Sequence, residues 1–409
     1  MEFIADFHIH SKYSRATSRE MTVEKIAESA QVKGVKLVGT GDFTHPQWCE
    51  ELEQKLKPAG NGLYQCSDTY FILVTEVNNT YTQNGKLRRI HNMIFAPDFE
   101  SVHRINEKLA SYGKLMVDGR PTLMLDSKRL VELTLGAGED VWVIPAHVWT
   151  PWFSLFGSNS GFDSIEECFG DYTSRIIALE TGLSSDPAMN WRLSSLDRFT
   201  LISNSDAHSP SKLGREANCL DCELSYYEII DTFRKKDREK FLYTIEFFPQ
   251  EGKYHYDGHR KCGVRVPPKE AMANGDLCPI CGKRLTVGVL HRIEILSDRE
   301  EEIVPPNAIP FKSLIPLEEI IADALGVGVD TQAVRNEYQR LIHKFQTEFS
   351  ILLDTPIDEL KAATLPEVAQ GIERVREGDV VIIPGYDGVY GEIRIFNREA
   401  KQPSQLNLF

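Results

Sequence analysis

Six short apolar runs in the first 215 residues are each followed closely by a histidine, an aspartate or a glutamate, and this placement constrains the fold most strongly. The residues that follow the runs are, in chain order, His8, Asp42, Glu76, His147, Glu180, and the pair Asp206 and His208. Any one of them alone would be an ordinary polar loop residue. Six equivalent placements are hard to obtain by chance, so we expect these side chains to form one site.

The runs have the length and composition of β-strands, and helical patterns lie between them. The first unit predicts a strand at Phe3–Phe7, a helix that Thr22 caps and Gly34 ends, and a strand at Val35–Thr40. Further runs lie at Phe71–Thr75, Met93–Ala96, Val141–Ala146, Ile176–Leu179 and Leu201–Ser203. Strands that alternate with helices predict an α/β fold with a mainly parallel sheet, open or closed. In a closed β/α barrel all the strands' carboxyl ends share one face, where active sites lie.

The residue types at these positions predict a site for several metal ions. His8 and His10 are two residues apart, so both point to the same side of an extended strand end. With the other candidates they exceed the three or four protein ligands of a single zinc, which favours two or three ions. The predicted ligands are His8, His10, Asp42, Glu76, His91, His147, Asp206 and His208. Clustered divalent ions suit phosphate ester hydrolysis, in which we expect Asp206, His147 and His208 to be catalytic.

The ordered set of motifs resembles the polymerase and histidinol phosphatase (PHP) family of phosphoesterases. The matching segments are HIHS at 8–11, TGDF at 40–43, TEVN at 75–78, RIHN at 89–92, PAH at 145–147 and SDAH at 205–208. This resemblance implies a distorted seven-stranded β/α barrel, (β/α)7, that holds up to three metals. Two positions depart from the pattern: Arg15 stands where many members have an acid, and Phe43 follows Asp42 where many have histidine. One ion is therefore expected to be held by Asp42, by His45, or by both.

Segments outside the predicted barrel resemble endonuclease Q, a group of PHP repair enzymes. These segments are ALETGLSSDPAMNWRLS at 178–194, EFFPQEGKYHYDGHRKCGV at 246–264, CPICGKRLTVGVLHR at 278–292 and PGYDGVYGEI at 384–393. The resemblance spans almost the whole chain and implies an endonuclease that cleaves DNA on the 5′ side of abasic sites and of deaminated bases such as uracil, hypoxanthine and xanthine. It also implies Mg²⁺ or Mn²⁺ in the reaction. Tyr254, Tyr256 and Tyr386 are candidate groups for stacking on an extruded base.

Two other functions remain open from the sequence. A small-molecule phosphatase could use the same barrel, but it would need neither a second metal site nor a partner-binding tail. A non-catalytic scaffold could carry the tail, but unused metal ligands would then be buried polar groups at a cost in stability.

Four residues with short spacings predict a structural zinc site. They are His259, Cys262, Cys278 and Cys281, two short pairs separated by a gap of fifteen residues. Four protein ligands complete the coordination sphere, so this zinc would stabilise a small structural unit and take no part in catalysis. The rival assignment replaces His259 with Cys219 and Cys222, which lie on an apolar, strand-like run.

The last five residues, QLNLF at 405–409, resemble the pentapeptide with which bacterial proteins dock on the DNA sliding clamp. Gln405 would make hydrogen bonds, while Leu406, Leu408 and Phe409 would fill an apolar groove. The alternative is a tail that folds back on its own domain. This resemblance also implies a bacterial source.

The chain carries a net charge of −14, which by itself argues against binding to nucleic acid. Acidic side chains that bind metals would weaken that objection. No apolar run approaches the ~18 residues of a membrane span, and the N-terminus lacks the basic start of a signal peptide, so we expect a cytoplasmic, nucleoid-associated protein.

The length and the changes in composition predict several domains. They are a catalytic PHP barrel at 1–215, a zinc-binding domain at 216–300, a proline-rich linker at 301–315, a helical domain with a glycine-rich hairpin at 316–398, and a flexible tail at 399–409.

Overall fold

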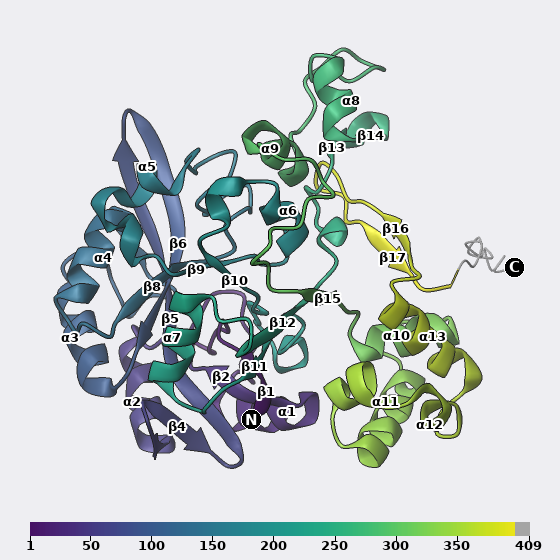
Figure 1. Cartoon of the computed structure of the whole chain (residues 1–409), viewed down its shortest axis with the longest axis horizontal. Coiled ribbons are helices and arrows are strands. Elements are labelled where there is room, and N and C mark those ends of the chain that lie inside the picture. Colours follow the sequence, from purple (N-terminus) through teal and green to yellow (C-terminus); the bar gives the residue numbers. More distant parts are fainter. Residues whose placement is uncertain (397–409) are drawn as a thin grey trace, which may run out of the picture.

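The computed structural model describes residues 1–396 and shows a mixed α/β fold (Figure 1). Among these residues the largest sheet has eleven strands, with a main path β15-β12-β11-β1-β2-β5-β4-β3; β6 and β7 pair with β5, and β8 pairs with β6. Its strands are β1 (Glu2–Asp6), β2 (Val35–Gly39), β3 (Lys57–Gly60), β4 (Leu63–Cys66), β5 (Thr69–Gln83), β6 (Lys86–Ala96), β7 (Thr122–Leu123), β8 (Trp142–Pro145), β11 (Ala217–Asp221), β12 (Phe241–Glu246) and β15 (Phe311–Ser313). The predicted α/β class is confirmed.

The first predicted unit is present as expected. Strands β1 and β2 pair in parallel, and helix α1 (Val23–Lys33) connects them. The side chain of Thr22 accepts a hydrogen bond from the amide of Lys25, and Gly34 ends the helix in the left-handed conformation with φ 88°. The apolar face of α1 is buried against the sheet, which fixes the direction in which β1 delivers the residues that follow it.

The expectation of a mainly parallel sheet is wrong, because β5 and β6 form a long antiparallel hairpin. Asn84 and Gly85 form its turn with φ of 52° and 74°. Two consecutive left-handed residues are typical of a two-residue turn, which joins antiparallel strands without a helix. As a result, Glu76 and His91 lie within the paired strands rather than beyond their ends, with Glu76 opposite Met93 and His91 opposite Asn78.

The remaining strands of the site come close to closing a ring. Strands β9 (Ala178–Glu180) and β10 (Thr200–Ile202) form a separate parallel pair, and Ile9 makes an isolated parallel bridge with Ala207. The amide of Val148 donates to the carbonyl of Glu180 at 3.0 Å, which links the segment after β8 to β9. Within residues 1–396, no ladder joins β8 to β9, so the closed seven-stranded barrel is not seen as one continuous sheet.

Helices cover the outside of this sheet on the side shown at the left of Figure 1. These are α2 (Pro46–Lys55), α3 (Phe99–Leu109), α4 (Ser127–Leu135), α5 (Ile165–Phe169), α6 (Pro187–Trp191) and α7 (Tyr226–Lys235), of which α6 lies toward the centre of the view. The side chains of Asp98, Asp126 and Ser225 cap the first turns of α3, α4 and α7.

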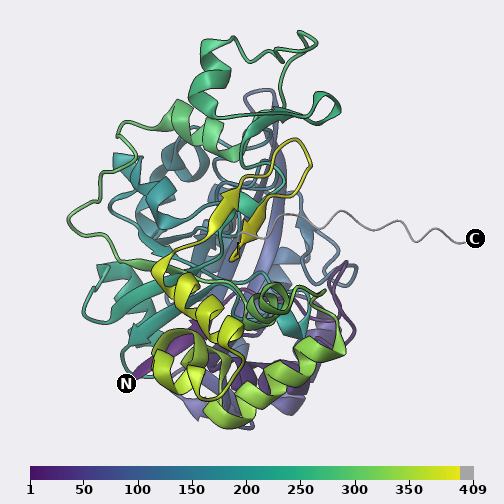
Figure 2. The same cartoon turned by 90° about the vertical axis from the view of Figure 1, so that its right-hand side faces the viewer.

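Two further units lie at separate places on the molecule in both views (Figures 1 and 2). One contains β13 (Asp257–His259), β14 (Val264–Val266), α8 (Pro268–Ala273) and α9 (Val289–Leu296). The other contains α10 (Leu317–Leu325), α11 (Gln332–Phe345), α12 (Ile357–Lys361) and α13 (Pro366–Glu377). The hairpin of β16 (Val381–Ile383) and β17 (Glu392–Arg394) runs between them, and it is the glycine-rich hairpin predicted within residues 316–398.

The apolar spacing at Val334, Tyr338, Leu341, Ile342, Phe345 and Phe349 predicts one helix from Asp330 to Leu353. This prediction is wrong, since α11 ends at Phe345. Gln346 takes φ of 74°, and the chain continues as a short π-helical turn at Ser350–Asp354. The break turns Glu348 toward α1, where it forms a buried ion pair of 2.6 Å with Lys33. The helical unit is thereby docked on the sheet.

The division into domains remains a proposal, and the sheet suggests moving one boundary. Strand β11 pairs with β1, β12 pairs with β11, and β15 pairs in parallel with β12. We therefore propose that the catalytic unit extends to about Phe248 and that residues 301–315 form an extended arm along its edge. Among the described helices, none is both long enough and apolar enough to span a membrane.

Candidate metal centre

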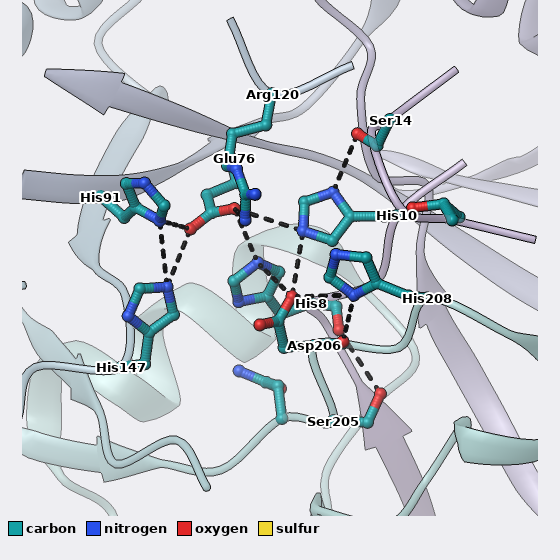
Figure 3. Close-up of polar contacts among 12 residues, drawn as sticks. His8, His10, Ser14, Glu76, His91, Arg120, His147, Ser205, Asp206 and His208 are labelled. Atoms are coloured by element: carbon teal, nitrogen blue, oxygen red, sulfur yellow. Dashed lines mark hydrogen bonds and ion pairs between the residues drawn. The ribbon is translucent and has the colours of Figure 1, made fainter. Parts of the chain in front are cut away.

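The structure brings six of the eight predicted ligands into two adjoining groups that share Glu76 (Figure 3). The first group is His8, His10, Glu76 and Asp206, and the second is Glu76, His91 and His147. Within each group one potential ligand atom per residue lies within 4.8 Å of every other. The residues come from the ends of β1, β8 and β10 and from the middle of the β5–β6 hairpin, so the sheet as a whole positions the centre.

Short distances connect the members of each group. His10 Nε2 lies 3.0 Å from Asp206 Oδ1 and 3.2 Å from Glu76 Oε2. On the other side, Glu76 Oε1 lies 2.5 Å from His91 Nδ1 and 2.9 Å from His147 Nε2. The carboxylate of Glu76 therefore faces both groups, one oxygen toward each, which is the geometry of a bridging carboxylate.

Three of the predicted site residues have left-handed backbones: Asp42 at φ 50°, His147 at φ 31° and Asp206 at φ 47°. Residues other than glycine rarely adopt this conformation, which costs of order 1 kcal/mol or more. Each lies in the loop that follows a strand: Asp42 after β2, which ends at Gly39, His147 after β8, which ends at Pro145, and Asp206 after β10, which ends at Ile202. Strain of this kind concentrates at functional sites.

The residues fit divalent cations. His8 Nε2, His10 Nε2 and Asp206 Oδ1 are buried atoms that make no hydrogen bond of acceptable geometry. Leaving such an atom without a partner costs roughly 1–3 kcal/mol. Imidazole nitrogens and carboxylate oxygens are the donors that zinc, iron and manganese take, and carboxylates also take magnesium. Cations shared among these atoms would give each of them a partner.

The charges of the centre also favour cations. Burial alone would raise the pKa of Glu76, but His91, Arg120 and His8 hold it well below its usual range. Burial opposes ionisation of Asp206 too, yet His10 and His8 keep its pKa low. Burial lowers the pKa of His91 to about 4, although the neighbouring carboxylate of Glu76 opposes this shift.

Glu180 lies behind His8 and outside both ligand groups. Its Oε1 is 3.0 Å from His8 Nδ1 and accepts a hydrogen bond from Asn204 at 2.8 Å, while its Oε2 accepts the amide of His147 at 2.7 Å. A carboxylate on Nδ1 keeps the proton there and leaves Nε2 as the ligand atom. Glu180 is the last residue of β9, one position earlier relative to the strand than the sequence indicated, and it supports a ligand rather than joining a group.

Asp42 has the same relation to His10. Its carboxylate lies 2.9 Å from His10 Nδ1 and accepts hydrogen bonds from the amide of Ser11 at 2.6 Å and from the hydroxyl of Ser14 at 2.9 Å. His45, the other candidate at this motif, stacks on Tyr13 at 4.4 Å, and its Nε2 lies 3.2 Å from the carbonyl of Met116. Neither residue belongs to a ligand group among the described residues, so ligation by Asp42 remains a proposal.

The open side of the centre is formed by Asp206, His208 and Arg120, whose side chains are 27%, 29% and 25% exposed. His208 lies beside His10, with ring centroids 4.5 Å apart, and is outside both groups. Arg120 Nη1 lies 3.0 Å from Glu76 Oε2. The sequence analysis missed Arg120, which sits in a loop and carries no motif spacing. Substrate must approach from this side, because the other ligands are buried.

The second predicted metal site is also assembled. His259, Cys262, Cys278 and Cys281 form one group, and His259 Nδ1 lies 3.4 Å from Cys281 Sγ. The rival pair is placed elsewhere, since Cys219 lies on β11 next to Glu2 and neither Cys219 nor Cys222 joins a group among the described residues. The predicted clamp-binding residues Gln405, Leu406, Leu408 and Phe409 lie outside the described residues.

The whole chain is similar to a solved structure. It matches the crystal structure of the lesion-specific endonuclease PfuEndoQ from Pyrococcus furiosus with 34% identity and a TM-score of 0.87, over 98% of each chain. The chain belongs to the endonuclease Q family. A structure of endonuclease Q with a 27-mer duplex that carries an abasic lesion at the active site matches with 34% identity and a TM-score of 0.85, over 98% of this chain and 99% of that one. Family membership confirms the prediction of a nuclease of the hydrolase class.

Parts of this endonuclease Q chain match in other comparisons. Residues 316–379 match the MJ0043 C-terminal domain model. The protein MJ0043 of Methanocaldococcus jannaschii is 38% identical over 251 residues, which is 60% of this chain. The matched segment spans 31% of that longer relative.

Proposed function

We propose that this endonuclease Q chain is a DNA repair enzyme that hydrolyses the phosphodiester bond 5′ to deaminated bases (uracil, hypoxanthine, xanthine) and to abasic sites by multi-metal-ion catalysis. The observation that carries the proposal is the pair of ligand groups joined by Glu76, with the partly exposed side chains of Asp206 and Arg120 beside them. A relative of the same length and fold was solved with an abasic duplex at its active site, which supports DNA as the substrate. We also propose that the ring of strands is a distorted PHP barrel.

The cations would be Mg²⁺ or Mn²⁺, with Zn²⁺ as a further candidate. The residues that would hold them are His8, His10, Glu76, His91, His147 and Asp206. When bound, the cations would supply Lewis-acid stabilisation of the phosphate and a hydroxide nucleophile near neutral pH. The protein supplies orientation and charge. Asp206 stays ionised, because His10 and His8 lower its pKa, and it is the most accessible ligand. It can therefore accept a hydrogen bond from the attacking water and fix its direction.

Arg120 and His208 would act on the phosphate side of the reaction. Arg120 has a guanidinium at the open edge with one nitrogen on Glu76, which leaves further N–H groups for a phosphate oxygen. Burial and His10 lower the pKa of His208, so this half-exposed imidazole is neutral and can pass a proton. We propose that His147, next to Glu76, is primarily a ligand.

A substrate-class assay tests the proposal. The purified protein is incubated with Mg²⁺ or Mn²⁺ and duplexes that contain one uracil, one hypoxanthine or one abasic site, and in parallel with phosphorylated metabolites. A nick at the lesion is the expected result. Turnover of metabolites without nicking would overturn the proposal in favour of a small-molecule phosphatase.

We further propose that QLNLF at 405–409 docks on a bacterial sliding clamp, which would deliver the enzyme to DNA in the nucleoid. Deletion of residues 405–409 should abolish binding to the clamp and leave the nicking of short duplexes unchanged. Clamp binding by the deleted chain would contradict this part of the proposal.

A further inference from the structure

Two large aromatic side chains are exposed: Trp152 at 42% and Tyr390 at 69%, and Trp152 lies in the segment that follows the predicted ligand His147. With Lys253, Tyr254 and Arg260 they form what we call the aromatic patch. Its members come from three stretches far apart in the sequence. Large exposed aromatic residues on a soluble domain mark surfaces that bind a partner.

The members of the patch are in contact through one turn of the β16–β17 hairpin. The rings of Trp152 and Tyr254 are 5.4 Å apart, edge to face, and Lys253 Nζ lies 4.5 Å from the ring of Tyr390. The amide of Gly388 donates to the carbonyl of Lys253 at 3.0 Å. The side chains of Arg260 and Tyr254 lie beside Gly388 in the turn of the hairpin. A methyl group in place of the Gly388 hydrogen would be 3.6 Å from Arg260 Nη1 and 3.7 Å from the Tyr254 hydroxyl.

The patch adjoins the metal centre through Phe153, the neighbour of Trp152. The carbonyl of Phe153 accepts the amide of His91 at 2.9 Å, and its ring centroid lies 5.0 Å from that of His91. Arg89 places its guanidinium 5.4 Å from the same ring. A DNA strand whose phosphate sits on the centre would therefore pass the patch within a few nucleotides.

The aromatic and basic side chains of the patch favour a nucleobase with its backbone phosphate as the ligand. Flat exposed rings bind nucleobases by stacking, and lysine and arginine bind backbone phosphates. Bases inside an intact duplex are already stacked, and only an opened site presents a free face. We propose that the aromatic patch stacks on a nucleobase that becomes unstacked when duplex DNA opens at a lesion. This inference rests on the proposed function.

Of the aromatic residues singled out from the sequence, the structure places only Tyr254 in the patch. Tyr256 and Tyr386 form a parallel bridge with one another and support the hairpin instead. Trp152 and Tyr390 had no distinguishing signal in the sequence.

The first test compares nicking rates of the full chain. Trp152→Ala with Tyr390→Ala should lower kcat/KM on a duplex with one lesion by about tenfold or more, whereas Trp152→Phe with Tyr390→Phe should stay within about threefold of the wild type. Tyr227→Ala is the matched control, because Tyr227 is 49% exposed and lies on α7, outside the patch. Affinity for an undamaged duplex should change less than twofold.

Unchanged nicking by the double alanine variant would overturn the inference. An equal loss of affinity for undamaged duplex would also overturn it, since the patch would then be a general DNA contact. Failure of the wild type to nick any lesion duplex would instead contradict the proposed function.

A direct test reports on the base itself. A 2-aminopurine is placed next to an abasic site, and the duplex is bound to Asp206→Asn protein, so that it is not cut. Stacking on the patch should quench the emission, and the same protein with Trp152→Ala and Tyr390→Ala should give brighter emission at saturation. Equal emission from the two complexes would overturn the inference, whether or not the wild type nicks DNA.

Discussion

The carboxylate of Glu180 lies 3.0 Å from Nδ1 of His8, while Nε2 of the same ring faces Glu76 and Asp206. The carboxylate thus fixes the tautomer of His8 and the direction of its free nitrogen. Because the same side chain accepts the amide of His147, it also ties together residues of both ligand groups.

Glu180→Gln should weaken the binding of activating metal by about 10–100-fold, because the amide no longer holds the proton on Nδ1 as a carboxylate does. Nicking measured across a titration of Mn²⁺ should shift to higher metal concentration and recover at saturation. Glu100→Gln is the control, since Glu100 is exposed on α3 and pairs with Arg104. A variant whose metal dependence matches the wild type would remove Glu180 from this role.

Cys281→Ser should lower the zinc content by one atom per molecule and reduce the melting temperature. The unit around this site has a small apolar core of Val266, Ala271, Cys278 and Leu285, so it depends on the metal for stability. Cys222→Ser tests the rival assignment and should leave the zinc content unchanged. Metal analysis of the two purified variants decides between the assignments.

Stability should fall as the pH rises from about 5 to 8, in part because of Glu246. Burial, and then Asp186, raises the pKa of Glu246 from 4.5 to about 8. The unfolded chain therefore loses this proton at lower pH than the folded chain, and the stabilisation present below pH 4.5 is lost as pH rises toward 8.

Glu246→Gln should make the stability less dependent on pH. Glutamine has nearly the same size and keeps an oxygen that can accept a hydrogen bond from Thr181 or Thr244, but it does not ionise. Between about pH 5 and pH 8, the difference in free energy of unfolding between the variant and the wild type should change by about 2–4 kcal/mol. This range follows because one pKa unit corresponds to about 1.4 kcal/mol. Urea unfolding at pH 5.5 and pH 8 measures it. A pH-independent difference would show that Glu246 has the same pKa in both states.

The sequence predicted the elements whose signals are local. The cap at Thr22, the ending at Gly34 and the strands that precede His8 and Asp206 are all where their residue types place them. The grouping of His8, His147 and Asp206 also followed from the sequence, because each lies a few residues beyond the carboxyl end of a strand.

The parts that escaped prediction depend on contacts between distant segments. The turn at Asn84 and Gly85 was a usable hairpin signal, and reading it would have placed His91 beside β5. The end of helix α11 at Phe345 is accompanied by the ion pair between Lys33 and Glu348, which are separated by 315 positions. Arg120 reaches Glu76 from a loop, and no local pattern marks it.

The most direct test of the central claim is to map the nick in an end-labelled duplex that contains one uracil or one abasic site, with Mg²⁺ or Mn²⁺ present. The account predicts one cut, at the phosphodiester 5′ to the lesion, and none in the matched undamaged duplex. It also predicts no cut by Asp206→Asn, which should melt at the wild-type temperature or above. A cut elsewhere, or cutting by Asp206→Asn at the wild-type rate, would contradict the account.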